Sequence, residues 1–341
     1  MRVLVTGSAG FIGRHLAELL VHSGHEVAGL DVQRPQVPVA LVDHRVCDLL
    51  DRHATMRTIA DTRPDVVVHL AAVTHIYGAT LDDYAPNVAG VENLLYAIQR
   101  APSVRRTVCT SSQLVCHAGY VSSRDEDYRP TTLYGESKVR TEQLWRAASG
   151  VGREWCIVRP TTIWGPGMNR HYLTFFGMLR RGRYVHVGRQ PIRKTYGFVG
   201  NTVHQLRRLA EALPEAIHGR TFYLGDYEPL DLFEWAETFR EVLGAPRIRT
   251  IPLPVAWTVA RTGDMINRLG YDRFPFNSFR LRNVITSSIL DLSSTEDVCG
   301  PLPFTMQDGV GYTVEWLRGI WSGAESHVPI PATSPSATSA A

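Results

Sequence analysis

The first 160 residues alternate short apolar runs with longer segments in which apolar residues recur at helical spacing. Runs such as Val66-Val67-Val68-His69-Leu70 are typical of strands in a parallel sheet that helices cover on both faces. The pattern predicts strands at residues 3–6, 26–31, 66–70, 106–110 and 156–159, and helices at residues 11–23, 54–62, 83–100 and 134–148. Right-handed crossovers place these helices on the two sides of the sheet, so we predict a doubly wound α/β fold.

Beyond residue 159 the alternation weakens, and short helical and strand patterns mix with many prolines. A tail rich in Ser, Ala, Thr and Pro is predicted to be disordered, because it has too few apolar residues to bury a core. The expected division is a sheet domain at residues 1–160 with returning segments at roughly 189–225, a smaller mixed α/β lobe at residues 161–188 and 226–320, and a disordered tail at residues 322–341.

Three glycines lie three residues apart between the first predicted strand and the first predicted helix, at Gly7, Gly10 and Gly13. They allow a tight turn, close approach of a pyrophosphate, and close packing of the helix, whose N-terminus offers N–H donors. Asp31 ends the second predicted strand, 18 residues beyond Gly13, where a carboxylate accepts hydrogen bonds from a ribose. The sequence therefore predicts a Rossmann-type dinucleotide site at Gly7, Gly10, Phe11, Ile12, Gly13 and Asp31.

The choice between NAD and NADP depends on two residues. The carboxylate of Asp31 repels a ribose 2′-phosphate, which favours NAD. Arg34, three residues on, offers the alternative of binding that phosphate. We expect NAD and leave NADP open.

Tyr134 and Lys138 begin a predicted helix and lie on one of its faces, because they are four residues apart. A phenol with a pKa of about 10 needs a nearby cation to act as a base near neutral pH. Lys138, together with a positive nicotinamide ring, is expected to supply it. Upstream, Thr110-Ser111-Ser112 closes a predicted strand at its carboxyl end, where ligands bind in doubly wound sheets.

These motifs occur with several others in a fixed order over residues 1 to about 170. The further blocks are residues 47–49, 69–72, 87–94, 110–115 and 159–167, with 224–230 beyond them. In these blocks the chain resembles the extended short-chain dehydrogenases/reductases of the NAD-dependent epimerase/dehydratase family. The resemblance implies that Tyr134 is the acid/base, that Lys138 holds the nicotinamide ribose, and that Ser112 bonds the reacting oxygen. It further implies cofactor contacts from Asp48, Leu49, Leu70, Ala71, Ala72 and Asn87.

The chain departs from parts of the family pattern. Gln113-Leu114 stands where 4,6-dehydratases carry an Asp-Glu pair, which disfavours dehydration and decarboxylation. Cys116 is interpreted as a small buried thiol in preference to an acid/base. Thr162 and Asn201 replace an Asn and an Asp of nucleotide-sugar relatives. The candidate substrate contacts are Thr162, Lys194 and Arg280, with Arg282 as an alternative cation.

We expect an enzyme, a nucleotide-sugar 4-epimerase that works by transient hydride transfer. Residues 274–279 and 291–295 resemble the 3β-hydroxysteroid dehydrogenase branch, so the alternative is a ketoreductase or hydroxyl dehydrogenase. A non-catalytic dinucleotide sensor is a third hypothesis, which the complete set of Ser112, Tyr134 and Lys138 disfavours.

The overall charge of +3 favours neither nucleic acid nor membrane as a partner, so we expect a small-molecule substrate. Five scattered cysteines without a C-x-x-C pair argue against a disulfide framework or a metal site. With no signal-peptide pattern after Met1, a cytoplasmic location is expected. The family resemblance implies a homodimer formed by the helices at residues 83–100 and 134–148.

Overall fold

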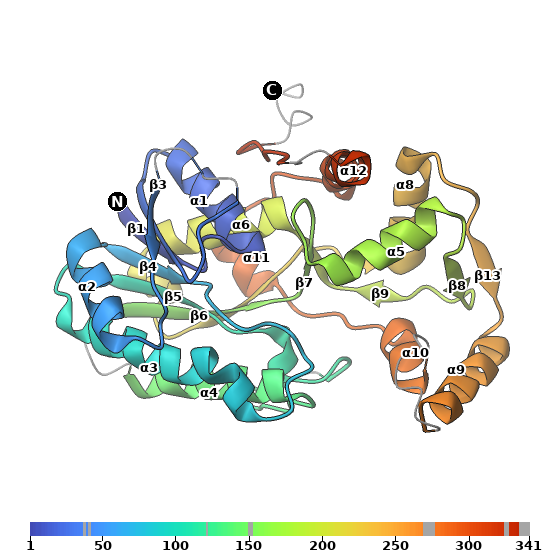
Figure 1. The fold of residues 1–341 in the computed structure, drawn as a ribbon, viewed down its shortest axis with the longest axis horizontal. Helices are drawn as coiled ribbons and strands as arrows, with labels where there is room; N and C mark the ends of the chain where they lie inside the picture. Colours follow the sequence, from blue (N-terminus) through green and yellow to red (C-terminus); the bar gives the residue numbers. More distant parts are fainter. Residues whose placement is uncertain are drawn as a thin grey trace.

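The computed structural model describes residues 1–36, 39, 42–120, 122–148, 153–268, 277–323 and 327–333. It contains a large sheet domain and a second group of helices and short strands beside it (Figure 1). No helix among the described residues is both long enough and apolar enough to cross a membrane.

Seven parallel strands form the central sheet in the order β11-β6-β5-β4-β1-β2-β3. Their bounds are β1 Arg2–Thr6, β2 Glu26–Asp31, β3 Val42–Val46, β4 Val66–His69, β5 Arg106–Thr110, β6 Glu154–Pro160 and β11 Thr221–Leu224. The order reverses between β1 and β4, as in a doubly wound fold, so the predicted fold class is confirmed.

Helices cover both faces of this sheet (Figure 1). On one face, Val3 and Val5 of β1 pack with α1 and α6, while Leu4 between them packs with α2, α3 and α4 on the other face. This alternation along a strand is what a sheet covered on both sides requires. The helices are α1 Phe11–His22, α2 Arg52–Thr62, α3 Ala85–Arg100, α4 Leu133–Ala147 and α6 Val199–Glu211, with the short helices η1 Leu81–Tyr84, η2 Gln113–Val115 and α7 Pro214–Ile217.

The second group of elements is built from helices and three short strand pairs, β10–β7, β12–β9 and β13–β8. Its helices are α5 Arg170–Arg180, α8 Leu232–Leu243, α9 Leu253–Arg268, α10 Ser278–Ile285, α11 Ser293–Cys299 and α12 Met306–Ser322. Its strands are β7 Thr162–Trp164, β8 Val185–Val187, β9 Arg193–Lys194, β10 Tyr196–Phe198, β12 Leu230–Asp231 and β13 Arg249–Ile251. Trp164, Phe176 and Phe239 continue the core of the sheet domain into this group. α11, which the expected boundaries assign to the smaller lobe, packs on α6 and β11 of the sheet domain.

Two features differ from the expected elements. β3 was not predicted, because its sequence Val-Asp-His-Arg-Val is polar; it forms the edge of the sheet, where most of its side chains meet water. The predicted helix 83–100 begins with the separate turn η1, because Thr80 and Asp83 form a capping box before α3 starts.

The expected disordered tail is wrong at its beginning. Ser322 is the last residue of α12. Farther on, Val328 is buried in the main core, and His327 lies 3.3 Å from the Glu18 carboxylate of α1. Apolar side chains in this stretch find a place against the sheet domain, which composition alone did not indicate. Residues 324–326 and 334–341 lie outside the described part of the chain.

Candidate active site

The glycine turn after β1 has no room for side chains. Gly7 has a left-handed backbone (φ 73°), and a Cβ atom there would lie 2.7 Å from the Ala71 nitrogen. A Cβ at Gly13 would lie 2.0 Å from the Gly7 carbonyl oxygen. Gly10 caps α1 without a side-chain hydrogen bond, so no side chain of the cap occupies the first N–H groups of the helix. The turn fits a pyrophosphate at a helix N-terminus, as the sequence predicts.

Asp31 lies beside this turn, at the carboxyl end of β2. One of its carboxylate oxygens accepts a hydrogen bond from the Ala9 nitrogen at 3.0 Å, and the other accepts from the Gln33 nitrogen at 3.1 Å. The Asp31 carbonyl accepts from the Cys47 nitrogen at 2.9 Å, which brings Asp48 to the same edge of the sheet. The carboxylate is thereby held where a ribose is expected.

Leu49 is a further predicted cofactor residue, and Arg34 is the residue that would bind the 2′-phosphate of NADP. Leu49 is buried, and its side chain packs against Gly90 of α3. Its side chain therefore contributes to the packing between α3 and the segment that follows β3. Arg34 is exposed. Asp31, and not Arg34, is the group built into the turn, which agrees with the expectation of NAD.

The segment after β4 forms the opposite wall of the turn. The nitrogens of Leu70 and Ala71 donate to the backbone and side chain of Thr6, at 3.1 and 3.2 Å. Asn87 of α3 holds the next residues, since its amide accepts from the Val73 nitrogen at 2.8 Å and donates to the Val73 carbonyl at 3.0 Å. Ala72 lies between these two anchored positions, so the predicted lining segment is fixed at the sheet edge.

Tyr134 lies in the first turn of α4, and its hydroxyl is hydrogen-bonded with Ser112. Ser112 follows β5, so the sheet and the helix bring together the two residues that the sequence pairs. Burial raises the pKa of the Tyr134 phenol to about 12, and the neighbouring Tyr84, whose ring lies 6.1 Å away, adds to this rise. Lys138 is not among the groups that shift this pKa in the structure, so its lowering by Lys138 together with a nicotinamide ring stays a prediction.

Lys138 is buried one turn along α4 and points to the end of β5. Its ammonium donates to the Thr110 carbonyl at 2.8 Å, and burial lowers its pKa to about 8. The ammonium of Lys138 therefore lies at the end of β5, directly before Ser111 and Ser112. In this structure the lysine fixes the helix to the sheet, while the phenol keeps its proton.

Two residues that the sequence analysis did not select complete the site. Glu142, fully buried and one turn beyond Lys138, accepts from the Ser111 hydroxyl at 2.6 Å and is paired with Arg159 of β6. Its four-residue spacing from Lys138 is the signal that identifies it. The Tyr84 hydroxyl donates to the His75 carbonyl at 2.8 Å, and its ring lies against the ring of Tyr134. Nothing in the sequence around Tyr84 indicates that it belongs to the site.

The predicted substrate contacts divide into two places. Thr162 of β7 accepts a hydrogen bond from the Gln113 side chain at 3.3 Å, so it adjoins the residue after Ser112. Lys194 is buried, and its ammonium donates to the Asn283 carbonyl of α10 at 2.6 Å, while burial lowers its pKa to about 8. Arg280 lies in the first turn of α10 and is exposed. The structure therefore places Lys194 and Arg280 with α10, and of the three only Thr162 adjoins the segment that contains Ser112.

Two other predictions concern neighbouring segments. Cys116 is buried, and its thiol donates to the Asp127 carbonyl at 3.3 Å, which supports the interpretation of a packed thiol. Residues 274–276, part of the segment that resembles steroid dehydrogenases, lie outside the described residues.

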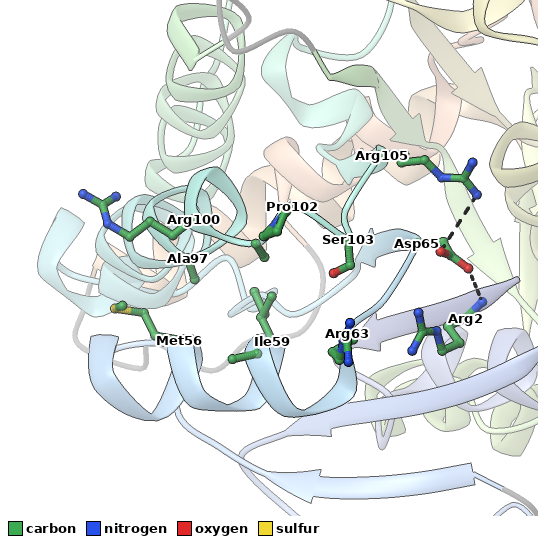
Figure 2. Close-up of a pocket in the computed structure, with 12 residues that line it drawn as sticks. Arg2, Met56, Ile59, Arg63, Asp65, Ala97, Arg100, Pro102, Ser103 and Arg105 are labelled. Atoms are coloured by element: carbon green, nitrogen blue, oxygen red, sulfur yellow. Dashed lines mark hydrogen bonds and ion pairs between the residues drawn. The ribbon is translucent and has the colours of Figure 1, made fainter.

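A cavity of about 630 Å³ lies at the opposite end of the sheet, near the amino ends of β1, β4 and β5. Figure 2 shows its single carboxylate, Asp65, accepting from the Arg2 nitrogen at 2.8 Å and lying 3.9 Å from the Arg105 guanidinium. Arg100 lies over the Tyr96 ring at 3.5 Å. Arg63 and Arg100 are at the carboxyl ends of α2 and α3, where cations are stabilised by the helix dipoles. We assign these arginines a structural role, because ligands of doubly wound sheets bind at the other end.

Known proteins resemble the chain in sequence and fold. It is 32% identical over 291 residues to the 3β-hydroxysteroid dehydrogenase/Δ5→4-isomerase of Mycobacterium tuberculosis, covering 79% of this chain and 77% of the relative. It is 29% identical to the 2-alkyl-3-oxoalkanoate reductase of Stenotrophomonas maltophilia, covering 79% and 83%. The crystal structure of UDP-glucuronic acid 4-epimerase from Bacillus cereus in complex with NAD superposes with a TM-score of 0.73, at 18% identity, covering 94% of this chain and all of that one.

The family model reaches from β1 to the end of β11. Residues 3–225 match it, a range that includes the glycine turn, Asp31, Ser112, Tyr134 and Lys138. The sequence relatives and the solved fold agree with this match. The chain belongs to the NAD-dependent epimerase/dehydratase family.

Proposed function

We propose that the protein is an NAD-dependent dehydrogenase or ketoreductase that interconverts a secondary alcohol and a ketone on an apolar carbon skeleton. The sequence motifs alone favour 4-epimerisation of a nucleotide sugar and leave this activity as the alternative. The order is reversed here because the relatives from Mycobacterium tuberculosis and Stenotrophomonas maltophilia are named as a hydroxysteroid dehydrogenase and an oxoalkanoate reductase. The solved epimerase, at 18% identity, supports the fold alone.

One observation at the substrate side carries the proposal. A nucleotide diphosphate needs cations, and Lys194 was the buried candidate for this role. Its ammonium already donates to the Asn283 carbonyl, and the same burial that lowers its pKa disfavours its charged form. Thr162 is likewise occupied by Gln113, and Leu114 cannot exchange a proton. These residues suit an apolar substrate better than a dianionic one.

The catalytic residues account for the proton in either direction. The glycine turn and Asp31 would hold the cofactor, which would accept the hydride as NAD during alcohol oxidation and supply it as NADH during ketone reduction. For ketone reduction, the protonated phenol of Tyr134 donates its proton to the carbonyl oxygen as that oxygen becomes a hydroxyl. For alcohol oxidation, the phenolate of Tyr134 removes the hydroxyl proton. Ser112 is hydrogen-bonded to the phenol and orients the same oxygen in both directions.

Epimerisation of a nucleotide sugar stays the second candidate, because the family includes it and the Bacillus cereus neighbour is an epimerase of that kind. A sensor without catalysis is disfavoured by the intact contact between Ser112 and Tyr134. For the catalytic candidates we propose the sheet domain as the cofactor domain and residues 161–188 and 226–320 as the substrate lobe.

The test is absorbance at 340 nm with the purified protein, NAD and a panel of 3β-hydroxysteroids, and with NADH and a 2-alkyl-3-oxoalkanoate. We expect one NADH formed or consumed for each substrate molecule converted. The same panel includes UDP-glucose and UDP-glucuronic acid, analysed for a changed sugar configuration. Conversion of a UDP-sugar without net NADH, in the absence of turnover of the apolar substrates, would establish the epimerase instead.

A variant sharpens this comparison. Lys194→Met removes the only buried cation of the proposed substrate contacts while keeping the length of the side chain. If the enzyme acts on apolar substrates, the variant keeps the KM for them within a few fold. If the enzyme binds a diphosphate through Lys194, the variant loses most of its affinity for UDP-sugars. Melting of the variant at the wild-type temperature shows that the fold tolerates the loss of the hydrogen bond to the Asn283 carbonyl, so the two KM values are comparable.

We also retain the homodimer as a proposal based on the family. Among the described residues, none of the large apolar side chains that are strongly exposed lies on α3 or α4. A dimer through these helices would therefore be polar, because the exposed residues of α3 and α4 include Glu92, Arg140 and Gln143. Light scattering of the purified protein measures its mass directly, and a monomer at micromolar concentration would contradict the proposal.

A further inference from the structure

α9 has two faces of different character. Ala256 and Ala260 are fully buried and pack against Leu281 of α10. On the other side, large apolar side chains face solvent: Val255 is 48% exposed, Val259 44% and Met265 62%. α9 and α10 form one end of the molecule, far from α2 (Figure 1).

The exposed face of α9 contains no charged residue over a wide arc. At 3.6 residues per turn, the six residues Val255, Thr258, Val259, Thr262, Met265 and Ile266 span an arc of about 120°. The two threonine hydroxyls donate to the carbonyls of Pro254 and Thr258, each at 3.0 Å. Because these hydroxyls are bonded to the backbone of the helix, the threonines contribute mainly their methyl groups to the surface.

Positive charge is concentrated in the segment of the chain that contains this face. Residues 245–290 contain seven arginines and two aspartates, with no lysine or glutamate, so this segment carries +5 in a chain whose total is +3. The balanced composition of the whole sequence conceals this asymmetry. Of the two acids, Asp264 accepts from the Ser278 nitrogen at 3.1 Å and lies in the field of Arg268 and Arg282. The arginines of this segment that the structure describes are all exposed: Arg247, Arg249, Arg261, Arg268, Arg280 and Arg282.

We propose that the outer face of α9, with the arginines of α9 and α10 around it, docks on an anionic lipid surface. An apolar helix face inserts into the boundary between headgroups and acyl chains, and flanking arginines bind lipid phosphates. Lipid is favoured over a protein partner because the excess of arginines in this segment complements the negative charge of an anionic membrane surface. The helix lies on the membrane and does not cross it, as no described helix is suited to span one.

This inference does not depend on the proposed substrate, although an apolar alcohol dissolved in lipid would be delivered to such an enzyme. The test is co-sedimentation of the full-length protein, without substrate, with vesicles of phosphatidylcholine containing one quarter phosphatidylglycerol, compared with pure phosphatidylcholine. We expect at least tenfold stronger binding to the anionic vesicles at 0.1 M salt, and a decrease at 0.5 M salt. NADH turnover is measured separately, so failure of either proposal is recognised on its own.

Surface variants connect binding with this face. The double variant Val255→Gln/Val259→Gln is expected to reduce vesicle binding at least tenfold, and Arg261→Glu about fivefold or more. Leu213→Gln is the matched control, since Leu213 is 74% exposed on a different element and its replacement is expected to leave binding unchanged. Equal binding to both vesicle types, or equal loss in the control, would overturn the proposal. So would a dimer in solution that the double variant dissociates, since the face would then bind a second copy of the chain.

Discussion

Glu142 and Arg159 form a buried two-point ion pair. The Arg159 Nε and Nη2 atoms donate to the two carboxylate oxygens of Glu142, each at 2.8 Å. The side chains are 0% and 1% exposed. Glu142 also accepts hydrogen bonds from the hydroxyls of Ser111 and Tyr128. The ion pair therefore connects α4 and β6 with the residue that follows β5 and precedes Ser112.

Breaking this pair from one side leaves the other charge buried. Glu142→Gln is therefore expected to lower the free energy of unfolding by about 3–5 kcal/mol, measured by urea denaturation. Arg140→Met is the matched control on the same helix, because Arg140 forms an exposed pair with Glu136; it is expected to cost less than about 1 kcal/mol. Equal costs for the two variants would show that the buried pair is no more important than a surface pair.

Removal of the Tyr134 hydroxyl tests the proton-transfer role. Tyr134→Phe keeps the buried ring and loses only the group that is bonded with Ser112. We expect kcat to fall by about 10²–10⁴, with unchanged melting temperature and unchanged binding of NAD by fluorescence. Wild-type turnover in this variant would assign the proton transfer to another group.

The raised pKa of Tyr134 predicts different pH profiles for the two directions. With a phenol pKa of about 12, the proton donor for ketone reduction is fully present from pH 6 to 9, so that rate is expected to be constant. The phenolate needed for alcohol oxidation increases tenfold per pH unit over the same range, and kcat/KM is expected to rise with it. A plateau of oxidation near neutral pH would instead mean that Lys138 and the bound cofactor lower this pKa, as the sequence analysis expected.

Coenzyme preference is expected to depend on Asp31. Asp31→Ser removes the charge that repels a 2′-phosphate and shortens the group that contacts the ribose. We expect KM for NAD to rise about tenfold, which corresponds to the loss of one charged hydrogen bond. The ratio of kcat/KM for NAD to that for NADP is expected to fall by more than this, because the repulsion of the 2′-phosphate is also lost. Steady-state kinetics with both coenzymes measures it. An unchanged preference would assign the selection of the coenzyme to a residue other than Asp31.

Local patterns were sufficient to predict the cofactor half of the molecule. The glycine turn, Asp31 and the pair Tyr134 and Lys138 each depend on a short spacing within one strand, turn or helix. Such spacings determine geometry before any long-range contact forms, and the structure brings these residues to the carboxyl edge of the sheet.

Features set by distant partners were not predictable in this way. Lys194 looks like an available cation in sequence, but Asn283, 89 residues later, takes its hydrogen bond. The polar strand β3 forms because its backbone pairs with the backbone of β2 at the edge of the sheet. The pKa of Tyr134 depends on burial and on Tyr84, which no spacing along α4 encodes.

The place of β11 at the end of the sheet has a consequence for biosynthesis. Its partner residues on β6 precede it by 64 positions, as Thr221 pairs with Ile157. At a synthesis rate of about 5–20 residues per second, the hydrogen-bonding edge of β6 remains open for roughly 3–13 s on each nascent chain. During that interval β6, which can pair with β5 on one side, presents one unpaired edge to other chains or to chaperones. A ribosome pause before β11 has emerged would prolong this exposure, whereas a pause after β11 has emerged would find the sheet complete.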